Sequence, residues 1–84
     1  MTTGVQFVGT LTPNQTQSWF TFNWPTNWHV VWYMMPTSPG PGAKLDWSIS
    51  VERGTGTVCT YWITVKNLTG STINFEGRYA ILNL

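Results

Sequence analysis

Four side chains in the last third of this 84-residue chain could together contact a polar ligand: Trp62, Asn74, Glu76 and Arg78. The amide, the carboxylate and the guanidinium stand at every second position, so in an extended strand they point to the same side. These groups can donate and accept hydrogen bonds to neighbouring hydroxyls, and an indole adds a flat apolar face. The combination suits an uncharged, hydroxyl-rich ligand such as a sugar. In the alternative interpretation, Glu76 and Arg78 form an ordinary solvent-exposed ion pair that contributes little.

A turn would have to bring Trp62 beside the three polar side chains. Residues 67–71 read Asn-Leu-Thr-Gly-Ser, which is typical of a hairpin connection, and Gly70 is able to adopt a positive φ. Antiparallel pairing of residues 58–66 with residues 72–82 would then place Trp62 on the same surface as the polar row.

The six tryptophans divide into those on apolar strand faces and those on polar ones. Trp19 and Trp62 lie on faces otherwise made of Thr, Gln, Asn and Lys, so each is expected to be partly exposed, paired across an interface or stacked on a ligand. Alternatively, each makes a cross-strand aromatic contact that shields neighbouring threonines. The aromatic residues on apolar faces are expected in the core: Trp24, Trp47, Phe20, Phe22, Phe75 and Tyr79.

The elements that position these residues are predicted to be strands. Apolar and polar residues alternate along most of the chain, and no segment has helical periodicity. The predicted strands cover residues 5–11, 18–24, 28–35, 45–52, 58–66 and 72–82, with a proline- and glycine-rich loop at 36–42. We therefore expect one all-β domain over residues 1–84, either a six-stranded antiparallel β-sandwich or a small barrel.

The composition and one strand indicate self-association. Charged residues make up 8 % of the chain, against about a quarter in an average protein. A domain of this size is only marginally stable, and its single cysteine cannot form a disulfide within the chain. Residues 28–35 are apolar on both sides, so this strand is either central in a sheet or covered by a partner subunit. With only six strands to share, the sequence favours a homo-oligomer with Trp28 and Trp32 at a subunit interface.

Other classes of function have little support in the sequence. No catalytic motif contains His29 or Cys59, one histidine and one cysteine are too few for a typical metal site, and no cofactor motif is present. The net charge is +1 with its basic residues dispersed, which argues against nucleic acid as a partner. No apolar run approaches membrane-spanning length and no signal peptide is recognised. We therefore expect a cytoplasmic, non-enzymatic protein without a transmembrane segment, with release by a non-classical route as an alternative.

Three segments give the chain a resemblance to the H-type lectins, the six-stranded sandwiches that include snail agglutinins. They are residues 20–25 (Phe-Thr-Phe-Asn-Trp-Pro), 28–32 (Trp-His-Val-Val-Trp) and 78–81 (Arg-Tyr-Ala-Ile). The resemblance is one of pattern and extends over most of the chain. It implies binding of N-acetylgalactosamine-type sugars at the subunit boundaries of a trimer or hexamer. It assigns no individual binding residues, because the family's sugar-contacting motif does not align with particular positions here, and the chain lacks a cysteine pair.

The leading hypothesis is a non-catalytic, carbohydrate-binding, lectin-like domain that acts as a homo-oligomer. Its candidate ligand-binding residues are Trp62, Asn74, Glu76, Arg78 and Trp19. The alternative is a structural or self-assembly domain whose exposed aromatic residues make subunit contacts. A third hypothesis, attachment to a membrane surface through exposed Trp and Tyr, is disfavoured because no basic cluster is present.

Overall fold

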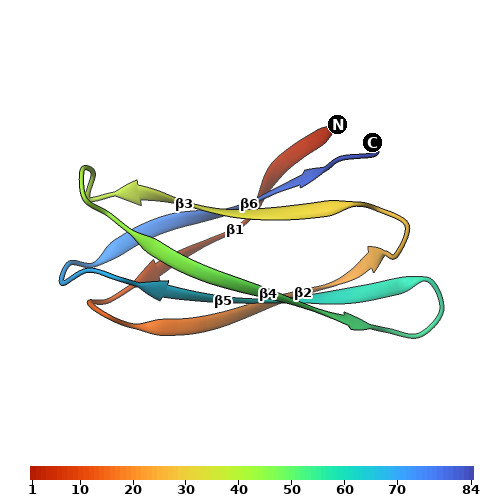
Figure 1. Cartoon of the computed structure of the whole chain (residues 1–84), viewed down its shortest axis with the longest axis horizontal. Helices are drawn as coiled ribbons and strands as arrows, with labels where there is room; N and C mark the ends of the chain where they lie inside the picture. The colour runs from red at the N-terminus through yellow and green to blue at the C-terminus, as the bar shows by residue number, and fades with distance from the viewer.

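The computed structural model describes residues 1–84 and contains six β-strands and no helix. The strands are β1 Thr2–Leu11, β2 Thr16–Pro25, β3 Val30–Ser38, β4 Leu45–Arg53, β5 Val58–Asn67 and β6 Ile73–Ile81. They form two three-stranded antiparallel sheets, in the orders β1-β6-β3 and β2-β5-β4, which lie one above the other in Figure 1. The sheets do not close into a barrel, so the predicted all-β, six-stranded architecture is confirmed as a sandwich. The chain offers no helix long and apolar enough to cross a membrane.

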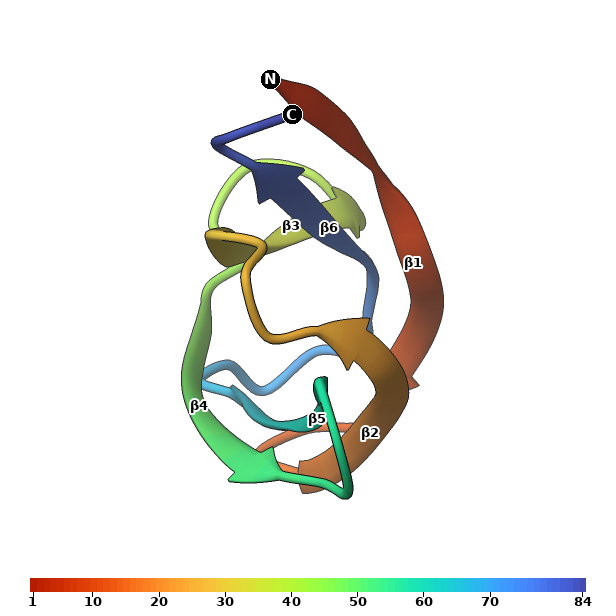
Figure 2. The same cartoon turned by 90° about the vertical axis from the view of Figure 1, so that its right-hand side faces the viewer.

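Successive strands mostly alternate between the two sheets. Only β4 and β5 are consecutive strands of one sheet, and every other connection crosses the sandwich. β1 and β6 pair with each other, with Thr2 opposite Ile81. The two ends of the chain therefore lie side by side, as Figure 1 and Figure 2 show from perpendicular directions.

The core is small and rich in aromatic side chains. Only 13 of 84 residues are buried, and Trp24 meets Trp32, Tyr61 and Tyr79 edge-on with ring centroids 5.3, 6.0 and 5.3 Å away. Edge-to-face pairs at such distances stabilise a core beyond the area that they bury. Trp24 is thus a core residue as predicted. Trp32 is buried in the same cluster and Trp28 packs against it while half-buried. The prediction of a subunit interface is therefore wrong for Trp32, and for Trp28 it stays a prediction.

Glycine and aromatic residues face each other between β1 and β6. The directly opposed pairs are Gly4–Tyr79, Phe7–Gly77 and Gly9–Phe75. A Cβ at Gly9 would lie 2.7 Å from the Phe75 ring, and one at Gly77 would overlap the Phe7 ring. Each ring therefore fills the space above its glycine partner. The alternation also fixes the register, because a two-residue slip would set ring against ring and glycine against glycine.

A bulge changes the phase of β2. Its pairing with β5 shifts between Thr21 and Trp24, where Asn23 has a φ of 65°. The extra residue turns Trp24 to the inner side, and Phe20 and Phe22 stay outside with 59 % and 62 % of their surface exposed. The prediction that these two phenylalanines belong to the core is therefore wrong.

β3 lies at the edge of its sheet rather than at the centre. It extends to Ser38, into the segment predicted as a loop. Its inner side packs into the sandwich through Trp32 and Met34, which are both buried. Its outer side exposes Val31 and Tyr33 to about half of their surface. The central position that the sequence left open is thus excluded. Within the chain, the Tyr33 ring meets Trp47 of β4 edge-on at 5.4 Å, and about half of its surface stays exposed.

The turn after β5 crosses between the sheets and is not the predicted hairpin. Asn67 is fully buried there. Its side-chain amide donates to the backbone oxygens of Leu11, Thr12 and Ser71 at 3.2, 3.1 and 2.7 Å. Its Oδ1 accepts from the backbone N–H and the hydroxyl of Thr69, and the glycine of this turn has no positive φ. One buried side chain thus joins the β5–β6 crossing to the β1–β2 crossing.

Candidate functional site

The four side chains that the sequence placed on one surface lie on two. Trp62 points outward from the β2-β5-β4 sheet, whereas Asn74, Glu76 and Arg78 point outward from the β1-β6-β3 sheet. The two outer faces are on opposite sides of the sandwich. The predicted grouping is therefore wrong, because the chain crosses between the sheets after β5 instead of turning back beside it.

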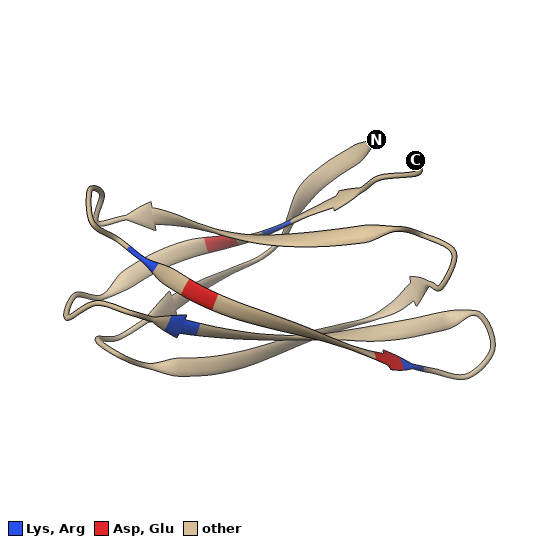
Figure 3. Ribbon diagram, in the orientation of Figure 1, with Lys and Arg blue, Asp and Glu red and all other residues tan.

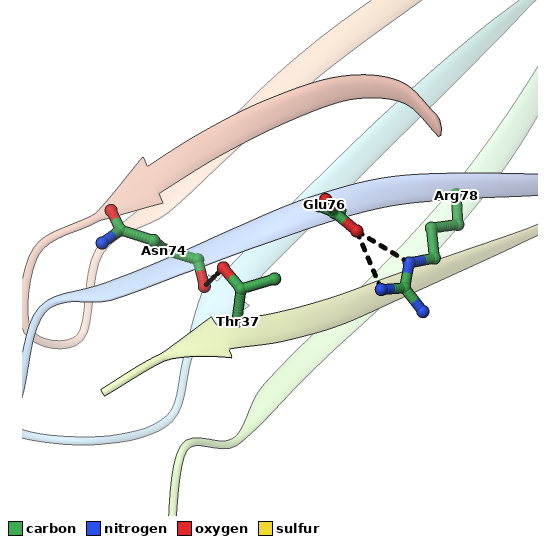
Figure 4. Close-up of polar contacts among 4 residues, drawn as sticks. All are labelled: Thr37, Asn74, Glu76 and Arg78. Carbon is green, nitrogen blue, oxygen red and sulfur yellow. Dashed lines mark hydrogen bonds and ion pairs between the residues drawn. The ribbon is translucent and has the colours of Figure 1, made fainter. Parts of the chain in front are cut away.

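Asn74 is hydrogen-bonded to both neighbouring strands. Its Oδ1 accepts from the Thr10 hydroxyl at 2.7 Å, and its Nδ2 donates to the Ser38 hydroxyl at 2.7 Å. Its backbone oxygen accepts from the Thr37 hydroxyl at 3.1 Å (Figure 4). These bonds join β1, β6 and β3 at one end of the sheet, so both polar groups of the Asn74 side chain already have partners.

Glu76 and Arg78 form an ion pair on the same strand. The Nε and Nη2 atoms of Arg78 donate to Glu76 Oε1 at 3.0 and 2.8 Å (Figure 4). They are the only charged residues in the β1-β6-β3 sheet, as Figure 3 shows, while the remaining charges lie on β4, on β5 and beside β4. The outer face of this sheet therefore carries no net charge. A partly exposed pair of this kind adds little stability.

Trp19 lies at the margin of the core and is half-buried. Its ring stacks on Phe7 at 5.3 Å and meets Phe75 edge-on at 5.3 Å. Its remaining surface lines a groove of about 390 Å³ at the edge where β1 and β2 meet. The groove is lined by Gln6, Phe7, Trp19, Phe20, Thr21 and Phe22. Trp19 thus reaches the surface beside two exposed phenylalanines.

The largest exposed aromatic surface is formed by Phe20, Phe22 and Trp62, which we name the aromatic platform. The Phe20 ring lies 6.3 Å from Phe22 and 5.1 Å from Trp62, with interplanar angles of 29° and 34°. The three rings form a continuous surface over β2 and β5. The sequence did not reveal the two phenylalanines as exposed, because residues 20, 22 and 24 would share one side of a regular strand. The bulge turns Trp24 to the side opposite Phe20 and Phe22. The signal was Asn23, since Asn accepts the positive φ of a bulge more readily than most residues.

Polar groups border the aromatic platform. The Trp62 indole N–H donates to Glu52 Oε1 at 3.1 Å, which holds the ring in place and leaves the second carboxylate oxygen without a hydrogen bond in the chain. Ser50 lies directly opposite Trp62 on β4, and the hydroxyls of Ser18 and Thr64 share a hydrogen bond of 2.8 Å. The rings are thus surrounded by hydroxyls and one carboxylate.

The opposite outer face exposes mainly aliphatic side chains. We name it the valine face, after Val5, Val8 and Val31, and it includes Tyr33. Val8 is 72 % exposed and the other three side chains are about half exposed. Shallow hollows of about 380 and 440 Å³ lie on this face, the first between Val5, Val31, Tyr33 and Arg78, the second beside Val8 and Asn74.

Groups with potential for covalent or metal chemistry are not brought together. Cys59 is buried and His29 is exposed, and no hydrogen bond joins them. No three His, Cys, Asp or Glu side chains gather where they could hold a metal ion. Burial, and after it the neighbouring Cys59, raises the pKa of the Tyr61 hydroxyl above its usual value of 10. Tyr61 is therefore a protonated core residue at neutral pH.

Comparisons with models of protein families, with curated proteins and with solved structures give no match for this chain. The resemblance to H-type lectins stays a prediction from three sequence segments. The side chains of the two outer faces are the observations from which a function can be inferred.

Proposed function

We propose that the protein is a non-catalytic, lectin-like carbohydrate-binding domain that acts as a homo-oligomer, with the aromatic platform as its sugar site. The observation that carries the proposal is the group of three neighbouring exposed rings on a face whose other outward groups are mainly hydroxyls. Exposed apolar surface of this kind is costly in water unless a ligand or partner covers it.

The platform matches the chemistry of a neutral pyranose sugar. Such a ring has an apolar C–H patch on one face, which can stack on Phe20 and Trp62, and hydroxyls around its rim. The free carboxylate oxygen of Glu52 can accept from two adjacent hydroxyls, and Ser50 can donate or accept. The sugar needs no charged partner, and the platform provides none apart from this carboxylate.

The proposal reassigns part of the predicted site. Trp62 is its central residue, and Trp19 contributes the wall of the groove beside Phe20. Asn74, Glu76 and Arg78 do not contact the sugar, because they lie on the opposite face of the sandwich. The sugar site is therefore built by β2, β4 and β5.

A glycan array followed by isothermal titration calorimetry tests this proposal. We expect Trp62→Ala to weaken sugar binding at least about tenfold, the loss of one good stacking contact. The matched control is Leu68→Ala, because Leu68 has the same 41 % exposure as Trp62 but lies in the β5–β6 turn; its affinity should equal that of the wild type. Absence of binding to any mono- or oligosaccharide at millimolar concentration would show that the proposal is wrong.

A second candidate function is structural self-assembly without a ligand. The aromatic platform also fits this function, because Phe and Trp side chains are enriched at the centres of protein interfaces. Under this alternative, Trp62→Ala and Phe20→Ala would dissociate the oligomer and no glycan would bind. Loss of glycan binding with an intact oligomer would instead support the lectin-like function.

A further inference from the structure

We propose that the valine face binds the same face of a second copy of this chain. This inference rests on the self-association in the proposed function and names the surface responsible for it.

The apolar side chains of this face flank its central ion pair on both sides. In the register of the sheet, Val5 and Tyr33 lie on either side of Arg78. Val8 and Met35 lie on either side of Glu76 in the next row. The exposed apolar groups of β1 and β3 thus form one surface across three strands, the kind of patch that marks an interaction site.

The charges of the valine face point to a copy of itself as the partner. Arg78 and Glu76 neutralise each other within one chain through two hydrogen bonds, and neither β1 nor β3 carries a charge. A strongly acidic or basic partner would find no complementary charge here. The same face of a second copy is equally neutral, and each ion pair enters the interface with two hydrogen bonds between Arg78 and Glu76 Oε1 already made. This reduces the cost of removing it from water.

The polar end of the face resembles the rim of an interface. Thr10, Asn74 and Ser38 lie in one row and are hydrogen-bonded to one another at 2.7 Å. A polar border beside an apolar centre is the usual arrangement of protein interfaces. Because the groups of this row have partners within the chain, another protein surface can approach them without leaving them unsatisfied.

Shape and size also fit a second copy. Val8 is the most exposed side chain of this face, and the hollow between Val5, Val31 and Tyr33 lies on the same face. Two copies can therefore place Val8 of each against the hollow of the other. The sandwich is 42 Å long and 14 Å across its strands. A face of these dimensions can bury at most about 600 Å² per partner, the lower end of specific interfaces, where association is weak and reversible.

Face-to-face packing would leave both aromatic platforms on the outside, pointing in opposite directions. A surface that displays many sugars could then engage more than one site of the same oligomer, which raises the apparent affinity without any new contact.

Multi-angle light scattering of the purified chain, with charged substitutions on each face, tests the inference. The wild type is expected to exceed its monomer mass of 9.5 kDa at micromolar concentration. Val8→Lys and Val31→Lys, on two different strands, should each weaken association about 100-fold, because each places an unpaired charge in an apolar interface. Val51→Lys is the control, since Val51 is 61 % exposed on β4 of the other sheet; it should keep the wild-type mass.

A measurement on the wild type alone guards against substitutions that impair folding. Dilution should change the NMR amide shifts of β1, β3 and β6 and leave those of the aromatic platform unchanged. A wild type that stays monomeric, lysine variants that keep the wild-type mass, or shift changes confined to the other sheet would each overturn the inference. Calorimetry with a soluble sugar separates the two proposals. Sugar binding without association refutes the self-association and leaves the sugar site, whereas association without sugar binding refutes the sugar site alone.

Discussion

The two outer faces of the sandwich both expose large apolar side chains, but of different kinds. Over β2, β5 and β4 the exposed apolar groups are flat rings beside hydroxyls and an unsatisfied carboxylate oxygen. Over β1, β6 and β3 they are mostly aliphatic, and the polar side chains between them are hydrogen-bonded to one another, with Glu76 Oε2 also left without a hydrogen bond. Flat rings suit stacking on the apolar face of a ligand, whereas aliphatic side chains suit packing against another protein surface. The type of exposed apolar side chain therefore distinguishes the two faces better than its exposure does.

The largest effect is expected from Gly77→Ala, which changes the layer between the two faces. A Cβ there would overlap the Phe7 ring, and such overpacking costs about 3 kcal/mol. The free energy of unfolding, from urea denaturation, should fall accordingly, and sugar binding and association should be lost together. Gly70→Ala is the control, because no atom lies within 4 Å of its added Cβ. If sugar binding and association were lost at different urea concentrations, the two faces would not share one core.

Asn67→Ala should have the next largest effect. The substitution removes the amide donor from the backbone oxygens of Leu11, Thr12 and Ser71, at a cost of about 2 kcal/mol. Urea denaturation should show this loss, with Asn27→Ala in an exposed turn as a nearly neutral comparison. Because Asn67 lies at one end of both sheets, the two faces should be affected equally, and a selective loss of either function would be unexpected.

Phe20→Ala should separate the two faces directly. It removes the ring between Phe22 and Trp62, so sugar affinity should fall about tenfold, or about 1.4 kcal/mol. The oligomer mass should not change, since the substitution is on the opposite side from the valine face. Calorimetry and light scattering on the same sample measure both outcomes. A drop in the oligomer mass would show that the aromatic platform forms a subunit contact and is not the sugar site.

The smallest effect at neutral pH concerns Tyr61, beneath the aromatic platform. Its pKa is raised in the folded chain, chiefly by burial and then by Cys59. The unfolded chain therefore releases the phenolic proton first, and the stability that the protonated form contributes is present below pH 10 and is lost as the pH rises above it. Urea midpoints measured across this range should fall more steeply for the wild type than for Tyr61→Phe. Equal slopes of the urea midpoint against pH would mean that Tyr61 does not cause the loss of stability at alkaline pH.

Alternation was sufficient to predict the strands and most of their inner faces. Cys59, Tyr61, Ile63 and Val65 are buried on β5, because a central strand without bulges keeps its period of two throughout. The bulge at Asn23 broke this period in β2 and reversed the assignment of two phenylalanines. A single irregular residue therefore concealed the aromatic platform.

The partners of the strands were not predictable from the turns. The composition of residues 67–71 suits a hairpin as well as a crossing, and the choice is made by Asn67 bonding to Leu11 and Thr12, which are far away in the sequence. For the same reason, the predicted grouping of Trp62 with Asn74, Glu76 and Arg78 failed although each of these residues points outward as expected. Local pattern determined the orientation of each side chain, and long-range contacts determined its neighbours.

The pairing of glycine with aromatic residues between β1 and β6 has a consequence for biosynthesis. As the chain leaves the ribosome, residues 2–11 emerge first, but the glycines and rings that complement them lie in residues 73–81. The first strand must therefore remain without its partner until nearly all of the sandwich has been translated. Pairing across such a sequence separation is slow, and an unpaired strand is prone to aggregation in the meantime. Translation speed and chaperone supply should thus limit the yield of this small domain more than its size suggests.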